Sequence, residues 1–347
     1  MKVMVTGATG FIGSHVVELL LHHQFAVRVF CRSVPLARRM FGERVEIVSG
    51  DMQDENGAAQ AVRDCDAVIH LAGYAKNWAK DPALFDRVNV AGTRYLLEAA
   101  LEAGLKKVVI TSTNLTIPAS GGGPPADENR PPLERFSNDY QASKCRMEKM
   151  IASYVAQGCP AVMVNPTRVF GPGILSEANS VTQMIRQYLA GTWRLILGDG
   201  NARGNYGFVA DVARGHLLAL TEGKVGERYL LGGSNLSFNE FFAILAEVSG
   251  RQRRMFHVPD RVALGIAGAA KFFALRFGLH PLITPEWVET FLQDWEINND
   301  KAVRDLGYSI TPFPLALKKT INWLNQSEAK EGSYENDYPY PESRTVL

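Results

Sequence analysis

Short apolar runs alternate with longer amphipathic segments through the first half of the chain. The apolar runs cover residues 2–7, 26–32, 45–51, 66–73 and 106–113, and apolar residues at helical spacing lie between them at 14–24 and 89–104. Runs rich in Val and Ile are typical of strands buried on both faces, and alternation of strand and helix is typical of parallel sheets. The pattern therefore predicts an α/β fold with a doubly wound parallel sheet.

The pattern becomes less regular after about residue 165. Gly and Pro interrupt the apolar segments there, as in NPTRVFGPG and LGDGNARGNYG, and the last residues are polar. We predict a first domain over residues 1–165 to which later segments return, a second region over 166–325 and a flexible tail over 326–347. The apolar stretch 262–279 contains Lys271 and Arg276, so it is too interrupted to span a bilayer. We predict a helix that faces the core, with contact to a membrane surface or a partner as the alternative.

Composition narrows the class of protein without identifying it. The 347 residues include 46% hydrophobic and 21% charged residues, and the formal net charge is +1. Such a chain has no overall field that would recruit nucleic acid or an anionic membrane. The four cysteines have no paired spacing and no His/Cys cluster accompanies them, so we expect no metal site, no disulfide framework and a reducing, cytoplasmic location. The chain begins with a strand-like segment, so no signal peptide is expected.

Three glycines follow the first predicted strand and open the first predicted helix. Gly7, Gly10 and Gly13 are spaced three residues apart in TGATGFIG. In such a turn the first glycine permits the sharp bend, the second lets a pyrophosphate approach the backbone, and the third lets helix and strand pack closely. The context of strand, turn and helix predicts a Rossmann-type dinucleotide-binding domain over residues 1–165, with residues 166–325 mainly binding substrate.

The end of the second predicted strand indicates which dinucleotide is bound. NAD-selective sites usually place an acid there to hold the adenosine ribose, whereas this chain has Cys31, Arg32 and Ser33. An arginine can pair with a ribose 2′-phosphate, so Arg32 favours NADP(H) over NAD(H), and Arg38 and Arg39 are close enough in sequence to help. The alternative is that Arg32 is a solvated surface charge, which would leave NAD(H) as the cofactor.

The ends of the third and fourth predicted strands should also line the cofactor cleft. Asp51 and Met52 could contact the adenine, and the small residues Ala72 and Gly73 would let the backbone run close to the cofactor. His70 lies within an apolar strand, so we interpret it as a packed histidine rather than a catalyst.

A tyrosine and a lysine form a Y-x-x-x-K pattern in NDYQASK. Tyr140 and Lys144 would share one face of a helix, where a lysine ammonium should lower the pKa of the phenol and make it an acid or base near neutral pH. The hydroxyl groups of Ser112 and Thr113 follow a predicted strand upstream, and either could hydrogen-bond a substrate oxygen beside Tyr140. The four residues together predict a catalytic set.

Several motifs occur in the order typical of one family. The segments TGATGFIGSH, GDM, HLAG, NVAGTRYLLEAA, VVITST, YQASK, NPTRVFGPG and FVADVARGH make the chain resemble an extended short-chain dehydrogenase/reductase from residue 1 to about 324. The resemblance implies that Tyr140 exchanges the proton, that Lys144 binds the nicotinamide ribose and lowers the pKa of Tyr140, and that Thr113 polarises the substrate carbonyl. It also implies a segment closing over the nicotinamide at 166–169, and a homodimer formed through two helices that include the Tyr140 helix.

The candidate residues fall into three groups. The catalytic group is Ser112, Thr113, Tyr140 and Lys144. The cofactor-binding group is Thr6, Gly7, Gly10, Phe11, Ile12, Gly13, Arg32, Asp51, Met52, Leu71, Ala72, Gly73, Asn89, Tyr140, Lys144, Pro166, Thr167 and Val169. The substrate-binding group is Tyr74, Thr113, Asn114 and Tyr206, with an apolar pocket expected from aromatic residues that also include Trp78, Phe208, Phe272, Phe273 and Phe277, although most of these could simply be core.

Three functions remain open at this point. The arginine after the second strand and the GERYLLGG segment resemble dihydroflavonol-4-reductase-like members, with 3β-hydroxysteroid dehydrogenases nearby, which implies an NADP(H)-dependent interconversion of ketone and alcohol on a small apolar or ring-bearing substrate. A nucleotide-sugar epimerase is the second possibility. The arginine with which those enzymes bind a substrate phosphate would correspond to Gly204 here, and Arg203 is one residue earlier. A cofactor sensor without catalysis is the third, and the presence of the complete catalytic set argues against it.

Overall fold

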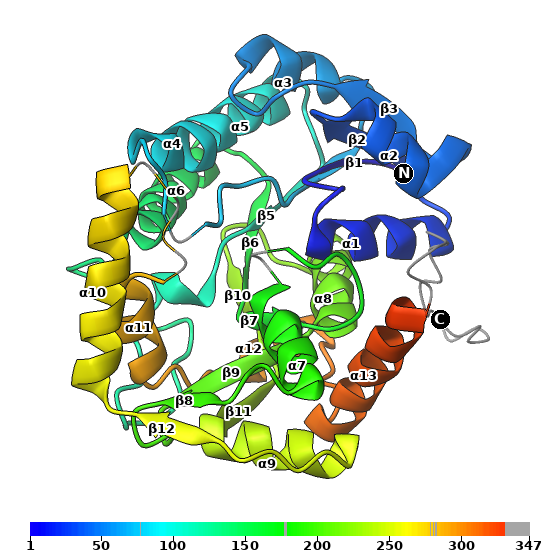
Figure 1. Ribbon diagram of the computed structural model, residues 1–347. Helices are drawn as coiled ribbons and strands as arrows, with labels where there is room; N and C mark the ends of the chain where they lie inside the picture. Colours follow the sequence, from blue (N-terminus) through cyan, green and yellow to red (C-terminus); the bar gives the residue numbers. More distant parts are fainter. Residues whose placement is uncertain (77, 177–178, 278, 280, 282, 330–347) are drawn as a thin grey trace.

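Seven parallel strands form the central sheet of the computed structural model, which describes residues 1–329 except 77, 177–178, 278, 280 and 282. Their order is β10-β6-β5-β4-β1-β2-β3, and each neighbouring pair is parallel (Figure 1). The strands are β1 (Lys2–Thr6), β2 (Ala26–Cys31), β3 (Glu46–Ser49), β4 (Ala67–His70), β5 (Lys107–Thr111), β6 (Ala161–Pro166) and β10 (Arg228–Leu231). The predicted doubly wound sheet is confirmed.

Helices cover both faces of this sheet because successive strand residues point to opposite sides. Val3 and Val5 face one layer of helices, whereas Met4 faces the other. The first layer contains α1 (Phe11–His22), α2 (Val34–Phe41), α8 (Val209–Thr221) and α12 (Asp300–Leu306). The second contains α3 (Glu55–Ala61), α5 (Gly92–Glu102), which follows α4 (Ala83–Asp86) and a π-helical stretch (Arg87–Ala91), and α6 (Asp139–Ala156).

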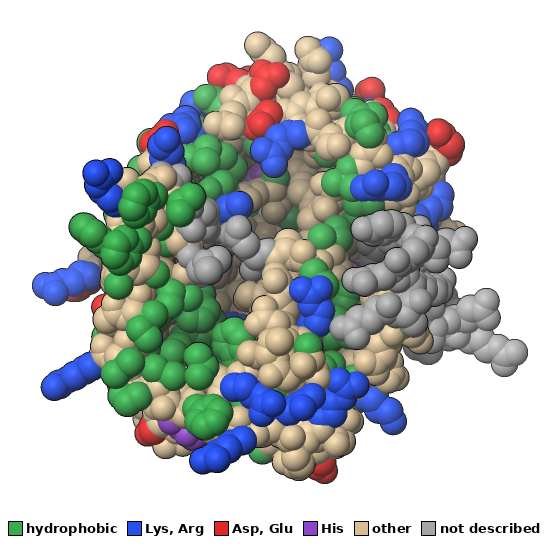
Figure 2. Space-filling model, viewed as in Figure 1, with side chains coloured by type: hydrophobic (Ala, Val, Ile, Leu, Met, Phe, Trp, Pro, Cys, Tyr) green, Lys and Arg blue, Asp and Glu red, His purple; other side chains and the backbone are tan. Residues whose placement is uncertain are grey.

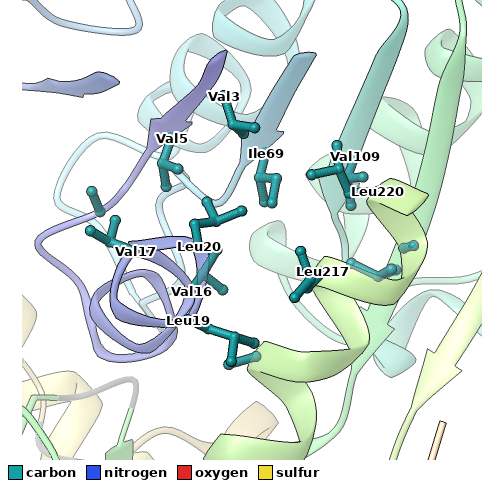
Figure 3. Packing of buried hydrophobic residues seen from close by; sticks show 14 of the residues in the cluster. Val3, Val5, Val16, Val17, Leu19, Leu20, Ile69, Val109, Leu217 and Leu220 are labelled. Carbon is teal, nitrogen blue, oxygen red and sulfur yellow. The ribbon is translucent and has the colours of Figure 1, made fainter. Parts of the chain in front are cut away.

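The first layer shows how later segments return to the sheet. Figure 3 shows side chains of α1 and α8 meeting beneath the strands, with Leu20 and Leu217 pointing toward Ile69 and Val109. Strand β10, from beyond residue 165, forms the edge of the sheet by pairing with β6. The first and second parts of the chain therefore share one hydrophobic core.

The second half adds smaller sheets and a core of its own. A three-stranded sheet consists of β7 (Arg168–Phe170), β9 (Arg203–Phe208) and β11 (Ser234–Ser237), and a two-stranded sheet of β8 (Leu195–Leu197) and β12 (Phe256–Val258). The remaining helices are α7 (Ser180–Ala190), α9 (Phe238–Ser249), α10 (Asp260–Phe277), α11 (Pro285–Leu292) and α13 (Phe313–Ala329). Phe170, Tyr188, Phe241 and Phe313 are among the buried aromatic residues that fill this core.

One expectation about the second half is wrong. Residues 262–277 of the apolar stretch belong to α10, but α10 turns only small residues such as Ala263 and Ala267 inward, whereas Phe272 and Phe277 are exposed. Helix α13 ends at Ala329, and residues 330–347 of the expected tail lie outside the described residues. Among the described helices, none combines the length and apolar character needed to cross a bilayer.

Candidate active site

The glycine turn joins β1 to α1 in a conformation that side chains would obstruct. Gly7 has φ = 68°, and a Cβ atom there would lie 2.6 Å from the backbone nitrogen of Ala72. A Cβ atom on Gly13 would lie 2.1 Å from the carbonyl oxygen of Gly7, so the helix could not approach the turn. Gly10 precedes α1, whose N-terminus has no side-chain cap. Free N–H groups at the start of α1 are thus available to an anion such as a pyrophosphate.

A cavity of about 690 Å³ runs along the carboxyl ends of the sheet strands. It lies at the ends of the neighbouring strands β1 and β4, where the order of the strands in the sheet reverses direction. Ligands of doubly wound folds usually bind at this position. The predicted residues that line it are Gly7, Gly10, Phe11, Ile12, Gly13, Arg32, Asp51, Met52, Leu71, Ala72, Gly73, Tyr74, Ser112, Thr113, Tyr140, Lys144, Pro166, Thr167 and Val169.

Two predicted cofactor residues do not line this cavity because they lie behind it. Thr6 is buried, and its hydroxyl oxygen accepts a hydrogen bond from the Ala72 backbone at 3.1 Å and contacts Nδ1 of His70 at 2.7 Å. Asn89 is also buried; it accepts from the Tyr74 backbone N–H at 2.7 Å and donates to Ser143 Oγ at 2.9 Å. Both side chains therefore shape the segment 72–74 that forms the cavity wall.

His70 is a packed histidine, as its apolar surroundings predict. Its Nε2 atom lies 3.0 Å from the hydroxyl of Thr93, so both ring nitrogens have hydrogen-bond partners. Burial lowers the pKa of His70 to about 3, so its imidazole is neutral at physiological pH.

Arg32 lies at one end of the cavity, directly after β2. Its side chain is exposed and forms no ion pair with any other described residue. The next residue, Ser33, caps α2 by accepting a hydrogen bond from Leu36 N–H, so a second helix N-terminus lies beside Arg32. Arg38 pairs with Glu43 at 2.5 Å, and neither Arg38 nor Arg39 lines the cavity.

The candidate catalytic side chains meet at the other end. Thr113 follows β5, and its hydroxyl is hydrogen-bonded to the hydroxyl of Tyr140. Lys144, one turn further along α6, donates from Nζ to the carbonyl oxygen of Thr111 at 2.9 Å. The Ser112 hydroxyl is buried and has no hydrogen-bond partner among the described residues. Ser112, Thr113, Tyr140 and Lys144 therefore all line the large cavity.

Ionisation of this group differs from the expectation. Burial raises the pKa of Tyr140 to about 12, and the hydrogen bond from Thr113 offsets only part of that effect. Burial also lowers the pKa of Lys144 to about 8. The expected low pKa of Tyr140 is therefore wrong for these protein groups, because burial dominates and the lowering contribution comes from Thr113. Tyr140 is a protonated phenol at neutral pH.

A second cavity of about 160 Å³ adjoins the catalytic end of the first. The two share Ala75, Thr113, Tyr140, Thr167, Arg168 and Ser180. The sequence reasoning missed most of its other walls, which include Thr284, Trp287, Phe291 and Trp295. Trp287 and Phe291 are four residues apart on α11 and stack at 4.1 Å between ring centroids, a spacing visible in the sequence but far from any motif.

Arg168 is the charged residue of this small cavity that the predictions also missed. Its guanidinium carbon lies 4.3 Å from the centre of the Phe291 ring. Nη1 is 3.4 Å from the hydroxyl oxygen of Tyr206, whereas Nη2 has no hydrogen-bond partner among the described residues. Arg168 forms no ion pair within the described part of the chain, so this wall carries an uncompensated positive charge.

The predicted substrate residues are divided between the cavities and the core. Tyr74 lines the large cavity, and its hydroxyl donates to the carbonyl oxygen of Trp78 at 3.3 Å. Asn114 lines the small cavity. Tyr206 and Phe208 are buried in the core of the second half. Neither these two nor Phe272, Phe273, Phe277 and Trp78 lines either cavity, so the expectation for that aromatic set is wrong.

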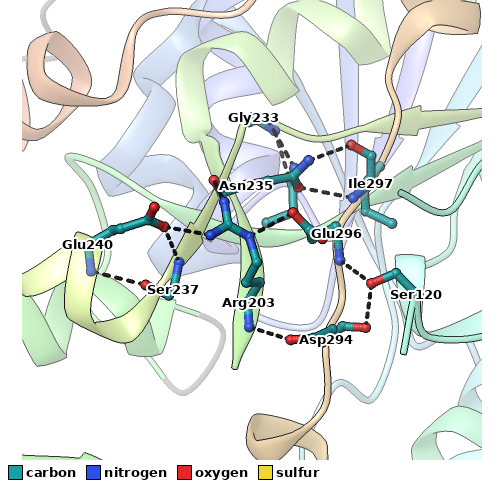
Figure 4. A network of polar contacts seen from close by, with 10 residues as sticks. Ser120, Arg203, Gly233, Asn235, Ser237, Glu240, Asp294, Glu296 and Ile297 are labelled. Carbon is teal, nitrogen blue, oxygen red and sulfur yellow. Dashed lines mark hydrogen bonds and ion pairs between the residues drawn. The ribbon is translucent and has the colours of Figure 1, made fainter. Parts of the chain in front are cut away.

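Arg203 belongs to a polar network that joins three segments (Figure 4). Its guanidinium group pairs with Glu296 at 2.7 Å and with Glu240 at 3.0 Å. Its backbone N–H donates to Asp294, whose carbonyl oxygen accepts from Ser120. Because two carboxylates already neutralise Arg203, it is poorly suited to hold a substrate phosphate.

Comparison with known proteins identifies the family. The sequence model of the NAD dependent epimerase/dehydratase family matches residues 3–232. A Synechocystis sp. protein named "Putative dihydroflavonol 4-reductase" is 30% identical, with 92% of this chain and 93% of that protein aligned. "Sterol demethylase protein B" of Methylococcus capsulatus is 29% identical over 94% of this chain and 99% of that protein.

A solved structure agrees with the fold. The UDP-glucose 4-epimerase of Thermus thermophilus, in complex with NAD, superposes with a TM-score of 0.75 at 26% identity and covers 94% of this chain and 99% of that one. No group of His, Cys, Asp and Glu among the described residues could hold a metal ion. The chain belongs to the NAD dependent epimerase/dehydratase family and is an NAD(P)-dependent enzyme of the extended short-chain dehydrogenase/reductase type.

Proposed function

We propose that the protein is an NADP(H)-dependent oxidoreductase that interconverts a ketone and a secondary alcohol on a small apolar or ring-bearing molecule. The observation that carries the proposal is the position of Thr113 and Tyr140, which line both the dinucleotide-sized cavity and the smaller aromatic one. A substrate in the small cavity would thus present its oxygen to the two hydroxyl groups at the place where the cavities meet.

The residues of the large cavity fit a nicotinamide dinucleotide. The turn at Gly7 and Gly13 leaves room that a Cβ atom would fill, and the uncapped N-terminus of α1 suits the pyrophosphate. Arg32, exposed and without an ion-pair partner among the described residues, suits a 2′-phosphate and favours NADP(H); NAD(H) is the alternative. When bound, the cofactor supplies the hydride for reduction or accepts it for oxidation.

The protein groups then control the oxygen and its proton. In the reductive direction Thr113 and Tyr140 hydrogen-bond the substrate carbonyl, which polarises it. Tyr140 would give its proton to that oxygen as the carbonyl is reduced, so the product would be an alcohol and Tyr140 would become a phenolate. The raised pKa of Tyr140 keeps the phenol protonated at neutral pH, which suits the proton donor of this direction.

The walls of the small cavity support an apolar substrate. Trp287, Phe291 and Trp295 supply flat aromatic surface, and Arg168 supplies one polar group that could orient an oxygen of the ligand. The names of two relatives refer to a dihydroflavonol and a sterol, which are ring systems of this kind. The free thiols of all four cysteines suit the reducing, cytoplasmic location that we propose.

An epimerase acting on a nucleotide sugar is the second candidate. The likeness to an NAD-bound UDP-glucose 4-epimerase favours it, since the same catalytic set can oxidise and then re-reduce one carbon. The neutralised Arg203 and the aromatic small cavity weigh against it. The two candidates differ in cofactor retention: a reductase releases its cofactor each cycle, whereas an epimerase regenerates it in place.

The test combines cofactor binding with turnover. Purified protein is titrated with NADPH and NADH, and ring-bearing ketones are screened for NADPH oxidation. Tyr140→Phe should abolish turnover and leave NADPH affinity nearly unchanged, since only the proton donor is lost. Tyr154→Phe is the matched control, because Tyr154 lies on the same helix with its hydroxyl bonded to Glu98 at 2.7 Å. Full activity of Tyr140→Phe would refute the mechanism, and NAD retained through purification would favour the epimerase.

A further inference from the structure

Helix α10 presents large apolar side chains to solvent. Seven of the fifteen exposed large hydrophobic residues in the described part of the chain lie within residues 262–279, and Phe272 and Phe277 are 64% and 67% exposed. The inward face of α10 holds Ala263, Ala267 and Ala274 instead. Figure 2 shows these hydrophobic side chains gathered along the left edge of the molecule, where Figure 1 places α10. A patch of this kind marks an interaction surface.

The charges on α10 and in the segment before it are mostly positive, whereas α11, which packs against α10, contributes Glu286 and Glu289. Residues 251–279 contain Arg251, Arg253, Arg254, Arg261, Lys271 and Arg276, but Asp260 as the single acid. Lys271 is paired with Glu286. Arg254, Arg261 and Arg276 are exposed and form no ion pair with other described residues. The surface therefore combines an apolar face with a basic border, in a chain whose overall net charge is only +1.

The same helix lies next to the proposed substrate cavity. Ala263 and Ala267 of α10 pack against Val288 of α11. The neighbouring residues Trp287 and Phe291 of α11 line the small cavity. The exposed apolar face of α10 and the aromatic wall of the small cavity therefore lie on two helices that pack against each other.

We propose that α10 docks the protein in the plane of a lipid bilayer, with its phenylalanines among the acyl chains and its arginines among anionic headgroups. An amphipathic helix of this composition suits an interface, since the apolar face and the cationic border meet two different layers of the membrane. A second copy fits less well, because a symmetric contact across this face would bring the arginines of one protomer to those of its partner. An apolar substrate dissolved in the bilayer would then lie beside the cavity, although the docking itself does not depend on the proposed reaction.

The test is co-sedimentation of the full chain with large vesicles of phosphatidylcholine, with and without phosphatidylglycerol. We expect binding that is stronger on the anionic vesicles and weaker at 1 M salt, where charges are screened within about 3 Å. The triple variant Phe272→Ser, Phe273→Ser, Phe277→Ser should lower the partition coefficient at least about tenfold. Arg261→Glu with Arg276→Glu should remove the preference for anionic vesicles while the apolar face is intact.

A matched control substitutes exposed apolar residues elsewhere. Val225→Ser, Val303→Ser and Leu315→Ser remove three side chains that are 50%, 47% and 47% exposed, and vesicle binding should stay as in the unmodified protein. Circular dichroism verifies that each variant is folded. Failure of the unmodified protein to bind any vesicle would overturn the proposal, as would equal binding of the phenylalanine variant. A dimer in solution that the phenylalanine variant dissolves, without vesicle binding, would assign the face to a second copy instead.

Discussion

Three buried histidines should make the protein sensitive to mild acid. Burial lowers the pKa of His15 and His216 to about 4 and that of His70 to about 3. Two of these histidines contact a backbone carbonyl oxygen: a ring nitrogen of His15 lies 2.9 Å from the oxygen of Pro172, and one of His216 lies 2.8 Å from the oxygen of Val212. Each contact raises the pKa of its histidine, but burial lowers it by more. Charging any of the three in place would put a cation into the core, which costs free energy.

The direction and size of this pH dependence of stability follow from proton linkage. Folded pKa values lie below the unfolded value of about 6.5, so the unfolded chain binds more protons between pH 6.5 and pH 4. Stability is therefore fully present above pH 6.5 and is lost as the pH falls through this window. Near pH 5.5 each histidine contributes a slope of about 1.2 kcal/mol per pH unit, and the three together about 3.5 kcal/mol per unit. Between pH 7 and pH 4.5 the three histidines together remove about 7 kcal/mol, which is comparable with a typical total stability of roughly 5–15 kcal/mol.

The assay is urea unfolding followed by circular dichroism at half-unit steps from pH 5 to pH 7. His70→Gln should lower stability at every pH, but the informative quantity is the slope, which should fall by about a third because one of three groups is gone. The control is His22→Gln with His23→Gln, since both side chains are exposed and folding changes their surroundings little. An unfolding free energy that is the same at pH 5.5 and pH 7 would refute the reasoning.

Two further predictions concern the site. Arg32→Glu should weaken NADPH at least about tenfold and NADH less than about threefold, because only NADPH carries the 2′-phosphate; titration calorimetry with both cofactors measures this, and equal losses would show that Arg32 does not contact that group. Arg168→Leu should raise KM for a ketone substrate about tenfold while NADPH affinity is unchanged, since Arg168 lines the small cavity; an unaltered KM in steady-state assays would remove Arg168 from the substrate site.

Most of the residues that local sequence signals assign to the cofactor line the large cavity. The glycine turn needs particular residues at adjacent positions, so Gly7, Gly10 and Gly13 could be interpreted without knowing the rest of the fold. The hydroxyl residues that follow a strand and the Tyr140–Lys144 spacing on a helix could be interpreted for the same reason, because each pattern lies within a short segment. Strand order, by contrast, depends on contacts between distant segments, and the return of β10 to the sheet was expected only in general terms.

The substrate side could not be predicted because its residues meet only in the folded chain. Arg168 and Trp287 are far apart in sequence and lie in no shared motif, yet both line the small cavity. Helix α10 has apolar residues on most of its circumference, so periodicity did not reveal that its alanines, rather than its phenylalanines, face inward. The pKa of Tyr140 likewise depends on how deeply the phenol is buried, which spacing along a helix does not disclose.

The edge position of β10 makes the two functional halves one thermodynamic unit. Chain from beyond residue 165 completes the sheet that carries the cofactor site, and α8 covers the same face as α1. Cutting the chain near residue 165 would expose the edge of β6 and the apolar side of α1, so neither piece should fold alone. A ligand that binds only in the small cavity must therefore raise the melting temperature of the whole chain. Substrates can thus be found by thermal shift alone, before any turnover is seen.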